Sequence, residues 1–221
     1  MKAALKNIVA HTYKPLLVRY LSKTRTYCYE DIRLEIPPEV FHPGFFTSTQ
    51  LLLQYLKQFP LKNKYVLELG AGSGLIAIQA AKEGAQVTAT DINPVAIEYL
   101  HKNSLQNKVN LEIIRSDLFA EIPACSFDII AINPPYYKKQ PVTFRDHAWY
   151  CGENGEYFSG LFNQLEGYIH DKTETIMVLC DGCDIEMIEA VAARNGFKLQ
   201  LMLTKQNILE KNFIYKIEKI E

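Results

Sequence analysis

The segment Glu68-Leu69-Gly70-Ala71-Gly72-Ser73-Gly74 decides the fold of this chain. An apolar run, Tyr65-Val66-Leu67, precedes it, and a helical pattern follows over residues 75–81. Glycines allow a tight turn and let a ligand come close to the backbone, so a strand, a glycine turn and a helix in this order are typical of a ligand-binding α/β sheet. The G-x-G-x-G spacing differs from the G-x-G-x-x-G of dinucleotide sites and argues against a nicotinamide-dependent oxidoreductase.

Strand-like and helical segments alternate from Lys64 onward. The expected strands are residues 65–67, 86–90, 109–114, 127–132, 175–179, 197–203 and 213–217, the last two forming a closing hairpin. The expected helices are residues 75–81, 94–105, 155–169 and 184–194. This alternation predicts an α/β fold with a seven-stranded, mostly parallel, Rossmann-like sheet and helices on both faces.

The first 45 residues have a different pattern. Residues 2–22 are expected to be helical with a break at Pro15, and residues 26–29 and 32–36 to form a hairpin. We therefore divide the chain into an N-terminal helical and β-hairpin extension (1–45) and a main domain (46–221). Thr47, with Gln50 three residues later, has the capping-box spacing and is expected to begin a helix.

The second crossover, between the strands expected at residues 86–90 and 109–114, is specified by its own sequence. Asn93 suits the N-cap position and Pro94 the first helical position. The residues expected to face the core from this helix are Ile97, Leu100, Ser104 and Leu105.

Four polar residues follow four successive expected strands: Glu68, Asp91, Asp117 and Asn133. Ligands of open α/β sheets bind at the carboxyl ends of the strands, so these residues are expected to converge. Glu68 would repel a pyrophosphate but suits a ligand with an ammonium and a sulfonium. Asp91 can accept hydrogen bonds from both ribose hydroxyls of an adenosine, and Asp117 is placed to meet its adenine amino group. Taken singly, each also fits a structural role, such as ending a strand or starting a helix.

The loop Asn133-Pro134-Pro135-Tyr136 follows the fourth of these strands. Two prolines stiffen it and leave its carbonyl groups free to accept hydrogen bonds. Asn133 adds an acceptor oxygen, and Tyr136 a flat face for stacking. The loop therefore suits a planar –NH2 group. An isolated Asn-Pro-Pro is often only a turn, but its place after three ligand-type strand ends favours catalysis. We expect Trp149, in contrast, to pack beneath the loop.

Together these motifs resemble the class I S-adenosylmethionine-dependent methyltransferases over roughly residues 40–221. Asn-Pro-Pro-Tyr resembles the motif of amino-methyltransferases, whose targets are exocyclic base amines or a glutamine amide. Residues 40–44 and 148–155 resemble segments of the HemK-type protein-glutamine methyltransferases and the related methyltransferase small-domain family.

The resemblance implies a class I methyltransferase fold, S-adenosyl-L-methionine as cofactor, no metal, and N-methylation of a planar amino or amide nitrogen. The implied catalytic residues are Asn133, Pro134, Pro135 and Tyr136. The implied cofactor-binding residues are Thr47, Glu68, Gly70, Gly72, Gly74, Asp91, Ile92, Asp117, Leu118 and Asn133. A protein glutamine is the favoured acceptor, and an adenine or guanine amine of RNA or DNA is the alternative. A cofactor-binding subunit without activity is less expected, because the acceptor motif is retained.

Composition and charge indicate where the protein is located and which kinds of partner it binds. The chain lacks an apolar span of 18 residues and a signal-peptide pattern, which indicates a cytoplasmic protein without a membrane partner. Residues 1–29 hold six bases and no acid, so this basic arm either contacts nucleic acid or the ribosome or is an exposed helix face. Five cysteines indicate reduced thiols, and Cys180-Asp181-Gly182-Cys183 lacks a second C-x-x-C to complete a zinc site.

Overall fold

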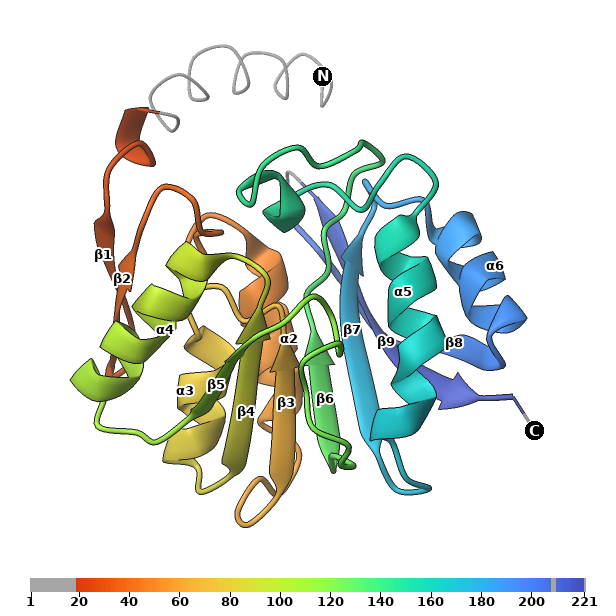
Figure 1. Ribbon diagram of the computed structural model, residues 1–221, viewed down its shortest axis with the longest axis horizontal. Coiled ribbons are helices and arrows are strands. Elements are labelled where there is room, and N and C mark those ends of the chain that lie inside the picture. Colours follow the sequence, from red (N-terminus) through yellow and green to blue (C-terminus); the bar gives the residue numbers. More distant parts are fainter. Residues whose placement is uncertain (1–18, 208–209, 221) are drawn as a thin grey trace.

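The computed structural model describes residues 19–207 and 210–220 (Figure 1). Most of the helical pattern expected over residues 2–22, and most of the basic arm, lies outside the described residues. A two-stranded antiparallel hairpin, β1 (Arg25–Tyr29) and β2 (Ile32–Ile36), precedes the main sheet, as expected from the sequence.

The main sheet has seven strands in the order β5-β4-β3-β6-β7-β9-β8. These are β3 (Tyr65–Leu69), β4 (Gln86–Asp91), β5 (Glu112–Arg115), β6 (Ile129–Ile132), β7 (Glu174–Cys180), β8 (Phe197–Gln206) and β9 (Lys211–Lys219). Strands β3 to β7 pair in parallel, and β9 is antiparallel to both β7 and β8. The predicted mostly parallel sheet and its closing hairpin are confirmed.

Helices cover both faces of this sheet. They are α2 (Thr47–Leu56), α3 (Leu75–Lys82), α4 (Pro94–Gln106), α5 (Glu156–Leu165) and α6 (Ile185–Arg194), with short 3₁₀ turns at Asp146–Ala148 and Glu166–Tyr168. One core cluster joins α2, α3, α4 and the hairpin to the sheet, and a second joins α5 and α6 to its other face. Neighbouring residues of β3 divide between the clusters, because successive side chains of a strand point to opposite faces.

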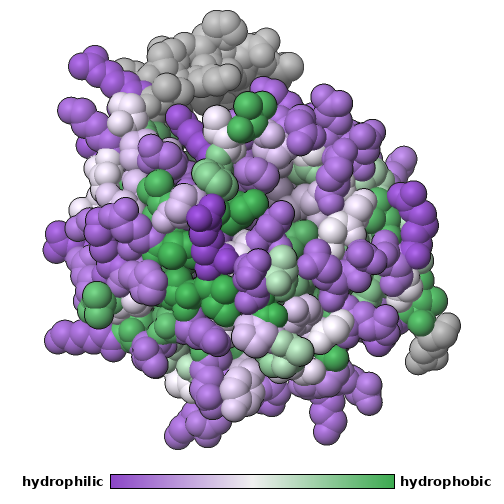
Figure 2. Space-filling model, in the orientation of Figure 1, coloured by the Kyte–Doolittle hydropathy of each residue, from purple (hydrophilic) through white to green (hydrophobic). Residues whose placement is uncertain are grey.

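Polar side chains cover most of the outer surface. In the space-filling view, hydrophilic residues dominate the visible face, and apolar side chains show mainly near its centre (Figure 2). Within the part of the chain that the structure describes, no helix is both long and apolar enough to cross a membrane.

Three local predictions differ from the structure. Strand β5 begins at Glu112 instead of residue 109. Helix α2 has Phe46 as its N-cap and no side-chain cap, because the Thr47 hydroxyl bonds to Glu210 instead. On α4, Leu105 is 78% exposed, and the capping by Asn93 and Pro94 is as predicted.

Asn103 of α4 is buried, unlike Leu105, and its side chain joins the hairpin to the glycine turn by hydrogen bonds. Its Oδ1 accepts a hydrogen bond from the Glu35 amide at 2.8 Å, and its Nδ2 donates to the carbonyls of Glu35 and Ser73 at 3.1 and 2.9 Å. The apolar face of β2 is fully buried in the same core as α3 and α4. The hairpin therefore packs as part of the main body, while the division of the chain after residue 45 stays a prediction.

We expect Asn103→Ala to lower the free energy of unfolding by about 1–3 kcal/mol, because it leaves the buried Ser73 carbonyl and the part-buried amide and carbonyl of Glu35 without partners. Asn107→Ala is the matched control: Asn107 makes the same pair of bonds to the backbone of Arg33 at the exposed end of the helix. Water can replace those bonds, so the control is expected to cost less than about 1 kcal/mol. Urea unfolding measures both, and equal losses would contradict the anchoring role of Asn103.

Candidate active site

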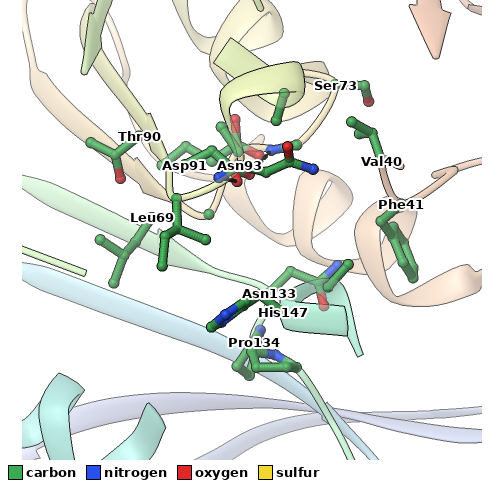
Figure 3. Close-up of a pocket in the computed structure, with 18 of the residues that line it drawn as sticks. Val40, Phe41, Leu69, Ser73, Thr90, Asp91, Asn93, Asn133, Pro134 and His147 are labelled. Carbon is green, nitrogen blue, oxygen red and sulfur yellow. Dashed lines mark hydrogen bonds between the residues drawn. The ribbon is translucent and has the colours of Figure 1, made fainter. Parts of the chain in front are cut away.

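A cavity lies at the carboxyl ends of β3, β4, β5 and β6. It encloses about 1130 Å³, including space open to solvent. Asp91 and Asn93 lie on one side of it, and Asn133, Pro134 and His147 on the other (Figure 3). Of the predicted site residues, it is lined by Glu68, Gly70, Gly72, Asp91, Ile92, Asp117, Leu118, Asn133, Pro134, Pro135 and Tyr136. Gly74 and Thr47 are not among the lining residues.

The glycine turn joins β3 to α3 and forms the floor of the cavity. Gly72 has a φ of +55°, and its amide donates to Asp91 Oδ2 at 2.9 Å, which ties the turn to the end of β4. Gly74 has a φ of +83°, and a Cβ there would lie 2.6 Å from Leu100 Cδ2. The third glycine therefore serves helix packing, whereas the first two face the cavity.

The Asp91 carboxylate joins the glycine turn to the residue that caps α4. Its Oδ1 accepts from the Asn93 amide at 2.8 Å, while its Oδ2 accepts from Gly72. Each carboxylate oxygen has a further lone pair, so the residue can still accept hydrogen bonds from a ligand. Burial raises the pKa of Asp91 above its ordinary value, and the two amide hydrogen bonds oppose that rise. Its role toward ribose hydroxyls stays a prediction.

Glu68 is a buried carboxyl on the wall of the cavity. It is 6% exposed, and its Oε2 accepts from the Ala77 amide in α3 at 2.7 Å. Burial raises its pKa to about 8, and the negative charge of Asp91 adds to the rise. A cation bound beside it would favour the ionised form and lower this pKa again.

The loop after β5 forms a third side of the cavity. Asp117 is exposed there, and Leu118 has a φ of +51°. The Ser116 hydroxyl donates to the Leu118 carbonyl at 2.8 Å and accepts from the Glu121 amide at 3.0 Å, so the turn is closed by its own residues. Asp117 thus faces solvent at the cavity, where it is free to meet a ligand.

The loop after β6 is stiff, and its Asn133 side chain is fixed at both ends. Asn133 Nδ2 donates to Thr49 Oγ1 at 3.1 Å, and Asn133 Oδ1 accepts from the Tyr136 hydroxyl at 2.6 Å. Pro134 and Pro135 are buried. Burial raises the pKa of Tyr136 well above its ordinary value, so its hydroxyl remains a donor. Stacking of Tyr136 on an acceptor stays a prediction.

The chain between Tyr137 and Cys151 forms one further wall of the cavity. The Tyr137 amide donates to the Trp149 carbonyl, and the Cys151 amide to the Tyr137 carbonyl, both at 2.9 Å. This pairing returns the chain to the cavity, so that Phe144, His147 and Trp149 line it. The turn belongs to the loops above the strand ends, at the top of Figure 1.

Trp149 packs in an aromatic cluster with Phe41 and Phe46. The ring centres of Phe41 and Phe46 lie 5.2 and 5.1 Å from that of Trp149. Phe41 and Trp149 also line the cavity, so Trp149 forms part of its wall as well as packing against the segment before α2. Phe41 and Trp149 lie in the two segments, 40–44 and 148–155, that resemble HemK-type enzymes, but no local pattern predicts their contact, because the two segments are distant in the sequence.

Two predicted features lie apart from the cavity wall. Thr47 bonds to Glu210 and accepts from Asn212 Nδ2 at 2.8 Å, and Thr49 lines the cavity in its place. Cys180 and Cys183 are free thiols with their Sγ atoms 3.9 Å apart. In residues 19–207 and 210–220 no group of three or more histidine, cysteine or acidic side chains is arranged to hold a metal ion.

Comparison with known proteins gives a consistent assignment. The sequence model of the family described as methyltransferase small domain matches residues 32–149, more than half of the chain. A proposed protein N5-glutamine methyltransferase of Methanocaldococcus jannaschii is 44% identical over 108 residues, which are 48% of this chain and 52% of that protein. A ribosomal protein L11 methyltransferase of Thermosipho africanus is 31% identical over 131 residues, 58% of this chain and 50% of that protein.

Solved structures show the same fold. A 16S rRNA methyltransferase of T. Thermophilus, in complex with AdoMet and guanosine, superposes with a TM-score of 0.62 at 20% identity, covering 88% of this chain and 50% of that one. This chain spans about half the length of the curated relatives that it matches.

We expect Glu68→Gln to change the pH dependence of stability. Between the ordinary value of 4.5 and the folded-state pKa of about 8, the folded protein holds a proton at Glu68 that the unfolded chain has released. Its contribution to the free energy of unfolding is therefore complete at low pH and is lost as pH rises toward about 8. Because glutamine cannot ionise, the Glu68→Gln variant should not lose this contribution as pH rises.

Urea unfolding at about pH 5 and about pH 8 measures the effect. The wild type should lose stability relative to Glu68→Gln across this range, by an amount on the order of a few kcal/mol. A constant difference between the two proteins would contradict the raised pKa.

Proposed function

Because the chain belongs to the methyltransferase small-domain family and so uses S-adenosyl-L-methionine, we propose that it transfers a methyl group to the side-chain amide nitrogen of a protein glutamine. The observation that carries this proposal is the pair of acceptors on the loop after β6. Asn133 Oδ1 has a second lone pair beside the one used by Tyr136. No hydrogen bond found among the described residues ends on the Pro134 carbonyl.

Two acceptors on one stiff loop match the two N–H groups of a planar –NH2. The nitrogen of an amide is a poor nucleophile, because its lone pair is delocalised into the carbonyl. Holding both hydrogens allows the nitrogen to become pyramidal and directs its lone pair toward the cavity. Positioning of reactants in this way can contribute about 7–11 kcal/mol to lowering a barrier.

The cavity fits the cofactor chemically. Gly70 and Gly72 give close access to the backbone, Asp91 and Asp117 offer acceptors for an adenosine, and Glu68 offers a carboxyl to a cation. When bound, the cofactor supplies a methyl group on a positively charged sulfur. The acceptor nitrogen would form a bond to this methyl carbon while the carbon–sulfur bond breaks with its electron pair going to sulfur, and the nitrogen, acidified by methylation, would lose one proton to water. This chemistry requires no strong general base from the protein.

Glutamine is favoured over other planar nitrogens by the M. jannaschii relative, whose name gives that activity. The principal alternative is a base amine of RNA, which the guanosine-bound structure exemplifies and which exposed Lys139 and Arg145 near the catalytic loop would suit. A ribosomal protein such as that modified by the second relative is a further acceptor class. A cofactor-binding subunit without activity has no use for the two acceptors on the loop.

We expect Asn133→Ala to lower kcat on the order of 10²–10³-fold, by analogy with loss of one transition-state hydrogen-bonding group. Cofactor affinity should change far less, because the glycine turn and Asp91 are untouched. Isothermal titration with S-adenosylmethionine and single-turnover assays separate the two quantities. Wild-type turnover by the variant would overturn the proposed role of the loop.

The acceptor class is tested by labelling. The protein is incubated with cell extract and cofactor bearing a tritiated methyl group, and protein and nucleic acid are then separated and counted. Methyl groups on an amide nitrogen should leave as volatile methylamine on hydrolysis in strong base, whereas those on lysine stay with the amino acid. We expect label in protein that is released in this way.

Two outcomes would contradict the glutamine assignment. Label in RNA that elutes with a methylated nucleoside would favour the base-amine alternative. Label in protein that resists hydrolysis would indicate an amine acceptor. Matched incubation with Asn133→Ala controls for label added by enzymes of the extract.

A further inference from the structure

Asn133 is held from outside its own loop by one residue, Thr49. The Tyr136 hydroxyl that bonds to Asn133 Oδ1 belongs to the same loop and moves with it. Thr49 instead belongs to the first turn of α2, and its Oγ1 accepts from Asn133 Nδ2. In the described part of the chain, this 3.1 Å contact is the only hydrogen bond that joins the Asn133 side chain to another element.

Thr49 is suited to act as a fixed point. It is 6% exposed, and Leu51, Leu52 and Leu53 of the same helix are buried in the core against the sheet. Helix α2 contacts β7 and β9, so the position of its first turn is set by strands beyond β6. Thr49, Asn133 and Tyr136 all line the same cavity.

We propose that Thr49 is a positioning residue that holds the Asn133 amide with its oxygen toward the methyl acceptor. This inference rests on the proposed function of Asn133. The last torsion of an asparagine side chain is soft and roughly two-fold, so the amide needs outside contacts to keep one orientation. With Nδ2 bound to Thr49, the oxygen end is the one left for Tyr136 and for an acceptor –NH2.

Loss of the Thr49 hydroxyl would leave Asn133 Nδ2 without its partner in a part-buried site. The amide would then rotate to recover a hydrogen bond, and the Tyr136 hydroxyl can accept from Nδ2 as readily as it donates to Oδ1. In that rotated state, Asn133 presents N–H groups to the N–H groups of the acceptor. Turnover would fall because only a fraction of molecules keep the productive orientation.

Thr49→Val tests this role, because valine keeps the shape of the side chain and lacks the hydroxyl. We expect kcat to fall about tenfold, the equivalent of one hydrogen bond, with cofactor affinity nearly unchanged. Thr49→Ser keeps the hydroxyl and should restore most of the rate. Activity is measured on the extract fraction that the wild-type protein labels, and cofactor binding by titration.

Thr88→Val is the matched control. Thr88 is also 6% exposed, and its hydroxyl donates to Glu112 at 2.8 Å, away from the residues that line the cavity. The same substitution there removes a hydrogen-bonded hydroxyl without touching Asn133, so we expect wild-type kcat. Thermal unfolding of all variants shows whether any loss of rate is a loss of folded protein.

A double variant shows whether Thr49 acts through Asn133. If it does, Thr49→Val combined with Asn133→Ala should be no slower than Asn133→Ala alone, because no amide remains to be positioned. Additive losses would overturn the inference, as would wild-type kcat in Thr49→Val, a defect confined to cofactor affinity, or no recovery in Thr49→Ser.

The outcomes also separate this inference from the proposed function. A slow Asn133→Ala with a fully active Thr49→Val would overturn the role of Thr49 alone. Wild-type turnover by Asn133→Ala would overturn both, since positioning an unused side chain has no effect on rate.

Discussion

The parallel register of β3, β4 and β6 is the constraint on which the site depends. Leu69 pairs with Thr90 on one side and with Ile132 on the other, so these three strands end at the same level. The residues that follow them, Gly70, Asp91 and Asn133, therefore start their loops at one edge of the sheet. A ligand lying across these ends would come within reach of the loop after β6 without any motion of the sheet.

This constraint explains what the sequence could predict. The strand ends and the glycine turn are local patterns, and so are the Asn93-Pro94 cap and the Asn-Pro-Pro loop, and each is where its pattern placed it. Thr47 is the instructive exception. Its spacing to Gln50 fits a capping box, but Glu210 and Asn212, more than 160 positions away, take its hydroxyl instead. Leu105 and the Phe41–Trp149 wall were missed for the same reason: contacts between distant segments decide them.

Charge is distributed in the cavity to favour a cation. Glu68 is buried and Asp91 is half-buried, desolvation raises the pKa of both, and the charge of Asp91 raises that of Glu68 further, so without a cation the pair resists full ionisation. A positively charged ligand relieves that cost, while a pyrophosphate would increase it. The glycine spacing and these two acids thus point the same way, toward a sulfonium cofactor and away from a dinucleotide.

The two halves of the cavity are built in different ways, and this bears on specificity. The half that we propose holds the cofactor consists of strand ends and backbone turns, which the fold itself positions. The half that we propose holds the acceptor combines the loop after β6 with side chains from α2 and from the turn that pairs with Tyr137. A change in either segment can alter the acceptor while leaving the cofactor half intact. Thr49, where the first turn of α2 bonds to Asn133 of the loop after β6, lies at the joint between the two halves.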